Sequence, residues 1–85
     1  MSSKLIGPID LDHAEIGGHL LRDMRLARGW TQQQVANAIE YSRTSITNME
    51  SGRQVVTLDV LCAAAEALGF TLELRATPVR GHHVE

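Results

Sequence analysis

The strongest constraint on this fold is a run of two short helical patterns between Thr31 and Gly52. The first repeats apolar residues three and four apart, at Val35, Ala36 and Ile39, as a helix with one buried face does. Thr31 stands before this stripe, and its hydroxyl can accept a hydrogen bond from an unpaired N–H of a first turn. We therefore expect a short helix that begins just after Thr31.

A second helical pattern follows a break at Glu40 and Tyr41. Ser42 can cap it, and Ile46 and Met49 supply inward positions. Ser51-Gly52 ends it, because glycine readily adopts the left-handed conformation that closes a helix. Its outer face is left with side chains that can hydrogen-bond base edges or phosphates of DNA: Arg43, Thr44, Thr47 and Asn48. The two helices together make a helix-turn-helix pattern.

Length and composition predict one small domain. Eighty-five residues, 44% of them apolar, support only a modest core, so stabilisation by oligomerisation is plausible. The sequence contains no membrane-length apolar run and no signal-peptide pattern, which predicts a cytoplasmic, nucleoid-associated protein. The single Cys62 excludes an internal disulfide, and its alanine-rich surroundings predict a small buried hydrophobe rather than a nucleophile.

The net charge of −2 argues by itself against a nucleic-acid-binding protein, but the charges are segregated. Five arginines and three acidic residues lie between Ile16 and Arg53, which gives this portion a charge of +2. The remaining segments carry −4. The helix that would read DNA thus lies in the basic part of the chain, although a solvated face could show the same imbalance by chance.

The flanking segments predict two more helices and one strand. A helix from Asp12 to about Arg28 contains Gly17-Gly18, a pair that indicates either close approach of another backbone or fraying. A later helix follows the Thr57 cap, and its inward residues are expected to be Leu58, Leu61, Cys62, Ala65 and Leu68. Strict alternation over residues 70–75 then has the period of a strand with one buried face. No other strand-like run can pair its backbone, so we expect the same strand of a second copy to do so.

Several residues stand at the spacing of a known family: Arg22-Asp23-Met24-Arg25, Gly29-Trp30-Thr31-Gln32, Val35-Ala36, Ser42-Arg43, Ile46, Met49-Glu50 and Gly52-Arg53. They resemble the lambda-repressor-like, or XRE (Cro/C1-type), helix-turn-helix family over about residues 16–69. Residues 67–74 look more narrowly like HipB-type antitoxins. The sequence departs from the family at Glu40, where glycine is common. A left-handed Glu costs roughly 1 kcal/mol or more, so either the turn is built differently or other contacts absorb the strain.

The resemblance implies a mostly α fold: a lambda-repressor-like domain of four to five helices with a C-terminal strand that pairs across a dimer. We expect a flexible arm (1–11), a DNA-binding domain (12–69), a dimerising strand (70–76) and a disordered tail (77–85). The implied function is a homodimeric transcriptional repressor on a palindromic operator in double-stranded DNA. A HipB-like antitoxin would also hold a HipA-like kinase toxin; the alternative is a stand-alone regulator without a toxin partner.

The expected site residues fall into four sets. Arg43 and Asn48 are the strongest base readers, because Arg matches guanine and Asn matches adenine bidentately, and Thr44 and Thr47 would add contacts. Phosphate contacts are expected from Gln32, Gln33, Ser45 and Arg53, with Gln32 at a positive helix end. The alternative for each is an exposed polar side chain without a contact. The dimer interface is expected at Phe70, Leu72, Glu73 and Leu74.

Arg25 and Glu50 form the fourth set. The resemblance implies that they make an ion pair behind the helix-turn-helix. The alternative is that Arg25 binds a phosphate of DNA.

The sequence offers little to an enzyme. The four histidines (His13, His19, His82 and His83) show no metal-ligand spacing with cysteine or carboxylates, although the pair near the C-terminus could bind metal adventitiously. The sequence has no nucleophile–base pair and no Gly-rich phosphate loop. We therefore expect no catalytic residues, no metal site and no cofactor.

Overall fold

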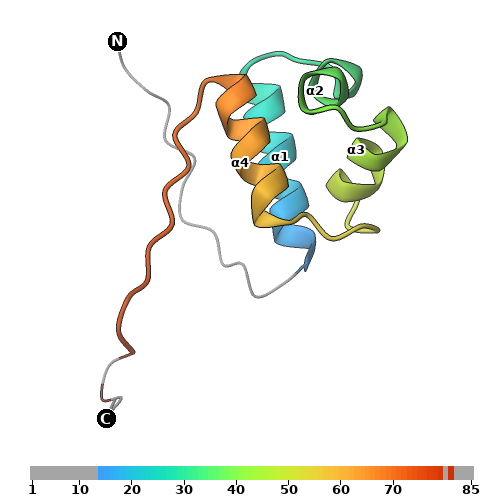
Figure 1. Cartoon of the computed structure of the whole chain (residues 1–85). Coiled ribbons are helices and arrows are strands. Elements are labelled where there is room, and N and C mark those ends of the chain that lie inside the picture. The colour runs from blue at the N-terminus through green and yellow to red at the C-terminus, as the bar shows by residue number, and fades with distance from the viewer. Residues whose placement is uncertain (1–13, 80, 82–85) are drawn as a thin grey trace.

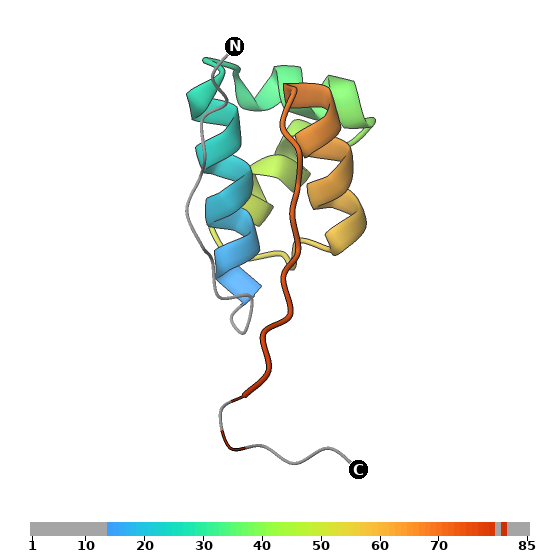
Figure 2. The same ribbon diagram turned by 90° about the vertical axis from the view of Figure 1, so that its left-hand side faces the viewer.

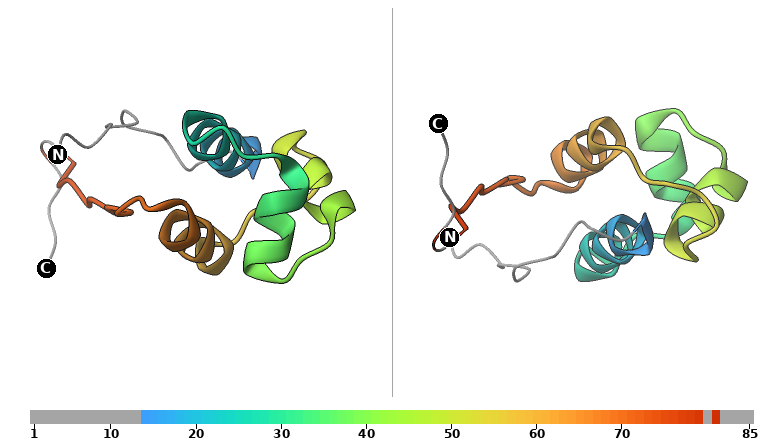
Figure 3. Two further views of the ribbon diagram at one scale, coloured as in Figure 1. Left: turned by 90° about the horizontal axis from the view of Figure 1, so that it is seen from above. Right: turned by 90° about the horizontal axis from the view of Figure 1, so that it is seen from below.

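Four helices make up the part of the chain that the computed structural model describes, residues 14–79 and 81. They are α1 (Ala14–Ala27), α2 (Gln32–Ile39), α3 (Arg43–Glu50) and α4 (Leu58–Leu68). α1 and α4 pack side by side, and α2 and α3 lie on one side of that pair (Figures 1 and 3). The expected mostly α fold is confirmed; the predicted arm, the start of the first helix and most of the tail lie outside the described residues.

Local hydrogen bonds fix where the helices begin. The Thr31 hydroxyl accepts from the Gln34 N–H at 3.1 Å, and the Gln34 side chain accepts from the Thr31 N–H at 2.8 Å, which completes a capping box on α2. Ser42 accepts from the Ser45 N–H at 3.0 Å to cap α3, and Thr57 caps α4 in the same way. The three caps predicted from the sequence are therefore confirmed.

The four helices bury one common core. It contains Leu21, Met24, Val35, Ala36, Ile46, Met49, Val60, Leu61, Ala64, Ala65 and Leu68. The stripes expected on α2 and α3 contribute to it, and Trp30 packs against it while only partly buried. Burial of this cluster at about 25 cal/mol per Å² of apolar surface is the main force that holds four short helices together.

The buried face of α4 differs from the predicted one. Leu58 is 49% exposed and Cys62 is also exposed, whereas both were expected to be buried. Val60 and Ala64 are buried instead. The helix is rotated so that its buried stripe is centred on residues 61, 64, 65 and 68, because α1 and α2 cover it from that side. The apolar periodicity predicted the helix correctly but misplaced the centre of its buried face.

Gly18 lies where α1 and α3 come closest. A Cβ atom at this position would lie 2.9 Å from the Met49 carbonyl carbon and closer still to its oxygen. Both partners are backbone atoms, so neither can turn away. Of the two explanations considered for the glycine pair, close approach of another backbone is therefore correct at Gly18. The adjacent Gly17 faces the Val56 side chain, with 3.1 Å between the added Cβ and that of Val56.

Glu40 adopts the left-handed conformation, with φ 60° and ψ 43°, at the end of α2. It is the only non-glycine residue with positive φ in the described part of the chain. The Glu40 and Tyr41 N–H groups both donate to the Ala36 carbonyl, which closes the helix end. The turn therefore has the shape that suits glycine, and the surrounding contacts absorb the strain.

Replacing Glu40 with glycine should raise the free energy of unfolding by up to about 1 kcal/mol, because glycine adopts this conformation without a Cβ clash. Glu40 is exposed, so the substitution removes little packing. Urea denaturation followed by circular dichroism would measure the change. Ala38→Gly, at an exposed position in the last turn of the same helix, is the matched control and should lower stability by up to about 1 kcal/mol. Equal losses in both variants would contradict the strain at Glu40.

Arg28 fixes the direction in which the chain leaves α4. Its Nε donates to the Leu68 carbonyl at 2.7 Å, and its Nη2 donates to the Gly69 carbonyl at 3.0 Å. The guanidinium also stacks on the Phe70 ring, 4.5 Å from its centroid. These contacts join the end of α1 to the end of α4, and the sequence alone did not indicate them.

Beyond Gly69 the chain is extended and runs back past the N-terminal ends of α1 and α4 (Figures 1 and 2). Phe70 and Leu72 pack against the core cluster, whereas Glu73 is exposed and Leu74 is 69% exposed. Residues 70–79 form no strand in the described single chain. A strand needs a partner for its backbone groups, so the strand expected at 70–76 and its pairing across a dimer stay predictions.

Candidate nucleic-acid interface

The outer face of α3 carries the four residues expected to read bases. Arg43 and Thr44 are exposed, and Thr47 and Asn48 are partly exposed. The inner face of the same helix is anchored in the core by Ile46, Met49 and Glu50. The helix thus presents a polar face to solvent, and an α-helix is an element that the major groove of B-DNA admits.

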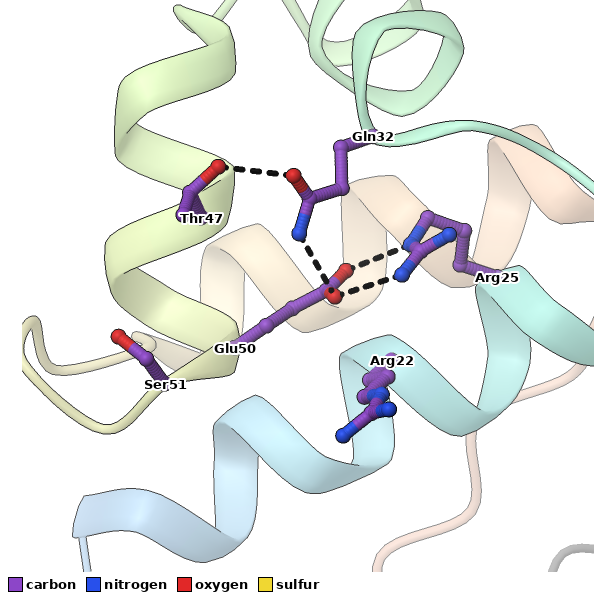
Figure 4. A pocket seen from close by; sticks show the side chains of 6 residues that line it. All are labelled: Arg22, Arg25, Gln32, Thr47, Glu50 and Ser51. Atoms are coloured by element: carbon purple, nitrogen blue, oxygen red, sulfur yellow. Dashed lines mark hydrogen bonds and ion pairs between the residues drawn. The ribbon is translucent and has the colours of Figure 1, made fainter.

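The Gln32 side chain is hydrogen-bonded within the protein at both of its polar atoms. Its Oε1 accepts a hydrogen bond from the Thr47 hydroxyl at 2.8 Å, and its Nε2 donates to Glu50 Oε1 at 3.2 Å (Figure 4). The Gln32 side chain therefore joins the first turn of α2 to α3. Its backbone N–H, and that of Gln33, have no acceptor among the described residues and remain available at the positive end of α2.

Thr47 is also engaged within the protein. Its hydroxyl hydrogen is shared between Gln32 Oε1 and the Arg43 carbonyl, which lies 3.0 Å away. A hydroxyl has only one hydrogen to donate, so donation to a base would require Thr47 to give up both acceptors. Only a hydrogen bond donated to DNA would thus compete with the link between α2 and α3, since the hydroxyl oxygen can still accept one.

The other expected phosphate contacts are dispersed around this surface. Gln33 is exposed, and its Nε2 donates to Asn37 Oδ1 at 2.9 Å, as on a solvated helix surface. Ser45 is partly exposed, and its Oγ accepts from the Ser42 hydroxyl at 3.0 Å. Arg53 is exposed in the turn after α3. The structure therefore brings Gln32 and Thr47 together, but not Gln33, Ser45 and Arg53.

Arg25 and Glu50 form a bidentate ion pair behind α3. Arg25 Nε and Nη2 donate to the two Glu50 oxygens, each at 2.8 Å, and Arg25 Nη1 donates to the Trp30 carbonyl at 2.9 Å. The side chains are 11% and 5% exposed. Hydrogen bonding to Glu50 raises the pKa of Arg25 above its usual value, although burial opposes this effect. The guanidinium therefore stays charged at neutral pH, and its donors are directed at protein acceptors.

An open polar pocket lies between α1, α2 and α3. Its lining residues are Arg22, Arg25, Gln32, Thr47, Glu50 and Ser51 (Figure 4). The hydrogen-bonded network from Arg25 through Glu50 and Gln32 to Thr47 forms one wall. The family resemblance indicated the Arg25–Glu50 pair, but sequence reasoning missed its extension through Gln32 to Thr47, because no local spacing links residues on α2 with residues on α3.

Residues 14–79 and 81 contain no cluster of three or more His, Cys, Asp or Glu side chains that could hold a metal ion. Within the same residues, every helix is too short or too polar to cross a membrane.

Residues 18–77 match the model of a family described as a helix-turn-helix domain. The chain belongs to this family. The match covers all of α2, α3 and α4, and it also covers the helix-turn-helix pattern from which the sequence argument began.

Curated relatives of the helix-turn-helix protein include transcriptional regulators. The competence pilus inhibition repressor of Acinetobacter baylyi is 38% identical over 55 residues, which are 65% of this chain and 50% of that protein. A candidate HTH-type transcriptional regulatory protein of Thermococcus kodakarensis is 40% identical over 48 residues, which are 56% of this chain and 15% of that protein. The chain thus spans half or less of the length of these relatives.

Solved structures show the same fold. The clp gene regulator ClgR of Corynebacterium glutamicum matches with a TM-score of 0.64 and 31% identity, over 68% of this chain and 75% of that one. The restriction-modification controller protein C.AhdI of Aeromonas hydrophila matches with a TM-score of 0.61 and 27% identity, over 73% and 92% respectively. The fold of the helix-turn-helix protein is that of known transcriptional regulators.

Proposed function

We propose that this protein is a sequence-specific DNA-binding transcriptional repressor that acts as a homodimer on a palindromic operator. The observation that carries the proposal is α3, whose inner face is locked into the core while Arg43, Thr44, Thr47 and Asn48 occupy its outer face. The similarity to a repressor and to regulators of solved structure supports it.

In this proposal α3 lies in the major groove, and Arg43 and Asn48 hydrogen-bond base edges. The first turn of α2 meets a phosphate through the N–H groups of Gln32 and Gln33, where the helix dipole favours an anion. Ser45 and Arg53 contact the DNA backbone beside the groove. Thr44 and Thr47 line the groove between the two principal readers.

Arg43→Ala and Asn48→Ala should each weaken binding to the cognate operator by about 1–3 kcal/mol and leave non-specific binding largely unchanged. The operator would first be selected from a random duplex library, and affinities then measured by fluorescence anisotropy at several salt concentrations. Gln33→Ala serves as a control on the exposed surface of α2, because the proposal assigns its phosphate contact to the backbone N–H. Equal losses on cognate and random duplexes would exclude Arg43 and Asn48 as base readers.

The dimer part of the proposal is supported by the C-terminal segment. Phe70, Leu72 and Leu74 share one face by their alternation, yet Leu74 is 69% exposed in the single chain. A second copy that pairs through residues 70–76 would cover it, and Glu73 would lie at the centre of the pairing. Two copies related by a two-fold axis would set their α3 helices about 34 Å apart, the spacing of successive major grooves on one side of the duplex.

Leu74→Asp should weaken dimerisation about tenfold or more, because a carboxylate would have to be buried where an apolar side chain was. Val79→Asp is the matched control: Val79 is 72% exposed and lies beyond the predicted strand. Sedimentation velocity would report the dimer, and far-UV circular dichroism would check the helices. If Leu74→Asp remains as dimeric as wild type, the strand is not the interface.

We further propose that the partner of this repressor is a HipA-like kinase toxin, which would make the protein a HipB-like antitoxin. This rests on the resemblance of residues 67–74 and on the net acidic charge of the segments outside 16–53, which would favour a basic partner. Co-expression with the neighbouring gene product, followed by gel filtration, is the test. Co-elution with a kinase-like protein would support the antitoxin; a neighbour without a kinase fold would favour the stand-alone regulator.

A further inference from the structure

Arg22 differs from the other arginines on α1 in having no acceptor among the described residues. Arg25 is held by Glu50 and the Trp30 carbonyl, and Arg28 by the carbonyls that end α4. Arg22 is exposed, and it has no hydrogen bond or ion pair to any residue in the described part of the chain. No described residue therefore holds its guanidinium away from a ligand.

The position of Arg22 gives this cation a defined surrounding. It lies one turn before Arg25 on α1 and lines the polar pocket between α1, α2 and α3 (Figure 4). Figure 4 shows it beneath the Arg25–Glu50 pair and across the pocket from Thr47, with no interaction drawn to the other residues. The pocket is open to solvent, so a group on another molecule can reach it.

The charges that line the pocket do not cancel. Its ionised residues are Arg22, Arg25 and Glu50, and the last two neutralise each other through two hydrogen bonds of 2.8 Å. The polar side chains are already engaged: Gln32 with Thr47 and Glu50, and Ser51 with the Asn48 carbonyl. One positive charge with several N–H donors remains, which suits an anion with more than one acceptor oxygen.

We propose that Arg22 binds a backbone phosphate of the DNA on which α3 reads bases. A phosphodiester supplies two acceptor oxygens and one negative charge, which match the single guanidinium. The pocket shares Gln32 and Thr47 with the surface proposed to meet DNA, so a duplex against α3 would bring its backbone close to Arg22. This inference rests on the proposed function and adds α1 to the contact surface.

The test compares Arg22→Gln with Arg22→Lys and Asp23→Asn on the selected operator and on a random duplex. Arg22→Gln should weaken binding to both duplexes by about tenfold and reduce the slope of log affinity against log salt by about one. Arg22→Lys keeps the charge and should recover most of the affinity. Asp23→Asn, at the adjacent exposed position, changes the net charge by the same amount in the opposite direction. We expect it to alter affinity by less than about twofold.

Three outcomes would overturn the role of Arg22. An unchanged affinity and salt slope in Arg22→Gln would show that no phosphate lies on it. A loss confined to the operator would indicate a base contact instead. A gain in Asp23→Asn as large as the loss in Arg22→Gln would indicate a long-range effect of net charge. If wild-type protein bound no duplex, the proposed function itself would fail, whereas normal wild-type binding with an unaffected Arg22→Gln would refute only this inference.

Discussion

Replacing Gly18 with alanine is expected to cost about 3 kcal/mol or more of the free energy of unfolding, enough to unfold much of a small domain. The added Cβ would overlap the backbone carbonyl of Met49, and neither group can rotate away. α1 would have to shift from α3, and this shift would loosen the core around Leu21 and Ile46. The gain in helix propensity, about 1 kcal/mol for Gly→Ala, is too small to compensate.

Gly17→Ala provides the matched control. This residue precedes Gly18 in the same helix, but the atom that its Cβ would meet is the Val56 Cβ, at 3.1 Å, in the connection before α4. Val56 lies outside the helices and can shift by a few tenths of an ångström, so we expect a change within about 1 kcal/mol. Thermal and urea denaturation of both variants would measure the difference. A Gly18→Ala protein as stable as Gly17→Ala would contradict the tight contact between α1 and α3.

The second large effect is expected at the ion pair. Arg25→Ala should lower the free energy of unfolding by about 3–5 kcal/mol, because it leaves the Glu50 carboxylate buried without its charge partner. Gln32 would still donate one hydrogen bond to Glu50, but a neutral amide cannot balance the charge. Because Glu50 lies on α3, the loss would also disturb the orientation of the proposed reading helix.

Double substitution separates the pair from its members. Arg25→Ala with Glu50→Ala should be more stable than Arg25→Ala alone, because no buried charge then remains uncompensated. Urea denaturation of the two single variants and the double variant gives the coupling energy. If Arg25→Ala melts like wild type but loses DNA affinity, then Arg25 belongs to the phosphate surface, as in the alternative considered from the sequence.

Local sequence features were sufficient for the four helices and for the starts of α2, α3 and α4. Thr31, Ser42 and Thr57 cap helices because their hydroxyls bond N–H groups only three residues away, so neighbours in the sequence determine them. At Glu40 the family resemblance gave the position of the turn and left two alternatives open; the structure decides for the left-handed conformation. The family resemblance indicated the pairing of Arg25 with Glu50, which lie 25 positions apart.

Features that depend on how helices pack could not be predicted in this way. The exposed side of α4 at Leu58 and Cys62 follows from where α1 and α2 cover that helix, and an apolar stripe alone does not specify its centre. The inward orientation of the Gln32 side chain depends on Thr47 and Glu50, both on another helix. From the sequence alone, Gln32 was expected on a phosphate because only its place at a helix start was visible.

The sequence by itself determined where α2, α3 and α4 begin and end, which residues form most of the core, and which polar residues stand on the outer face of α3. These follow from interactions over three or four residues and from the helical period, both of which are written in the chain order. The tertiary structure alone decided that Gly18 must lack a side chain, that Gln32 joins α2 to α3, and that Arg22 has no protein acceptor among the described residues. Each of these depends on distances between helices, which packing sets and which no local pattern encodes.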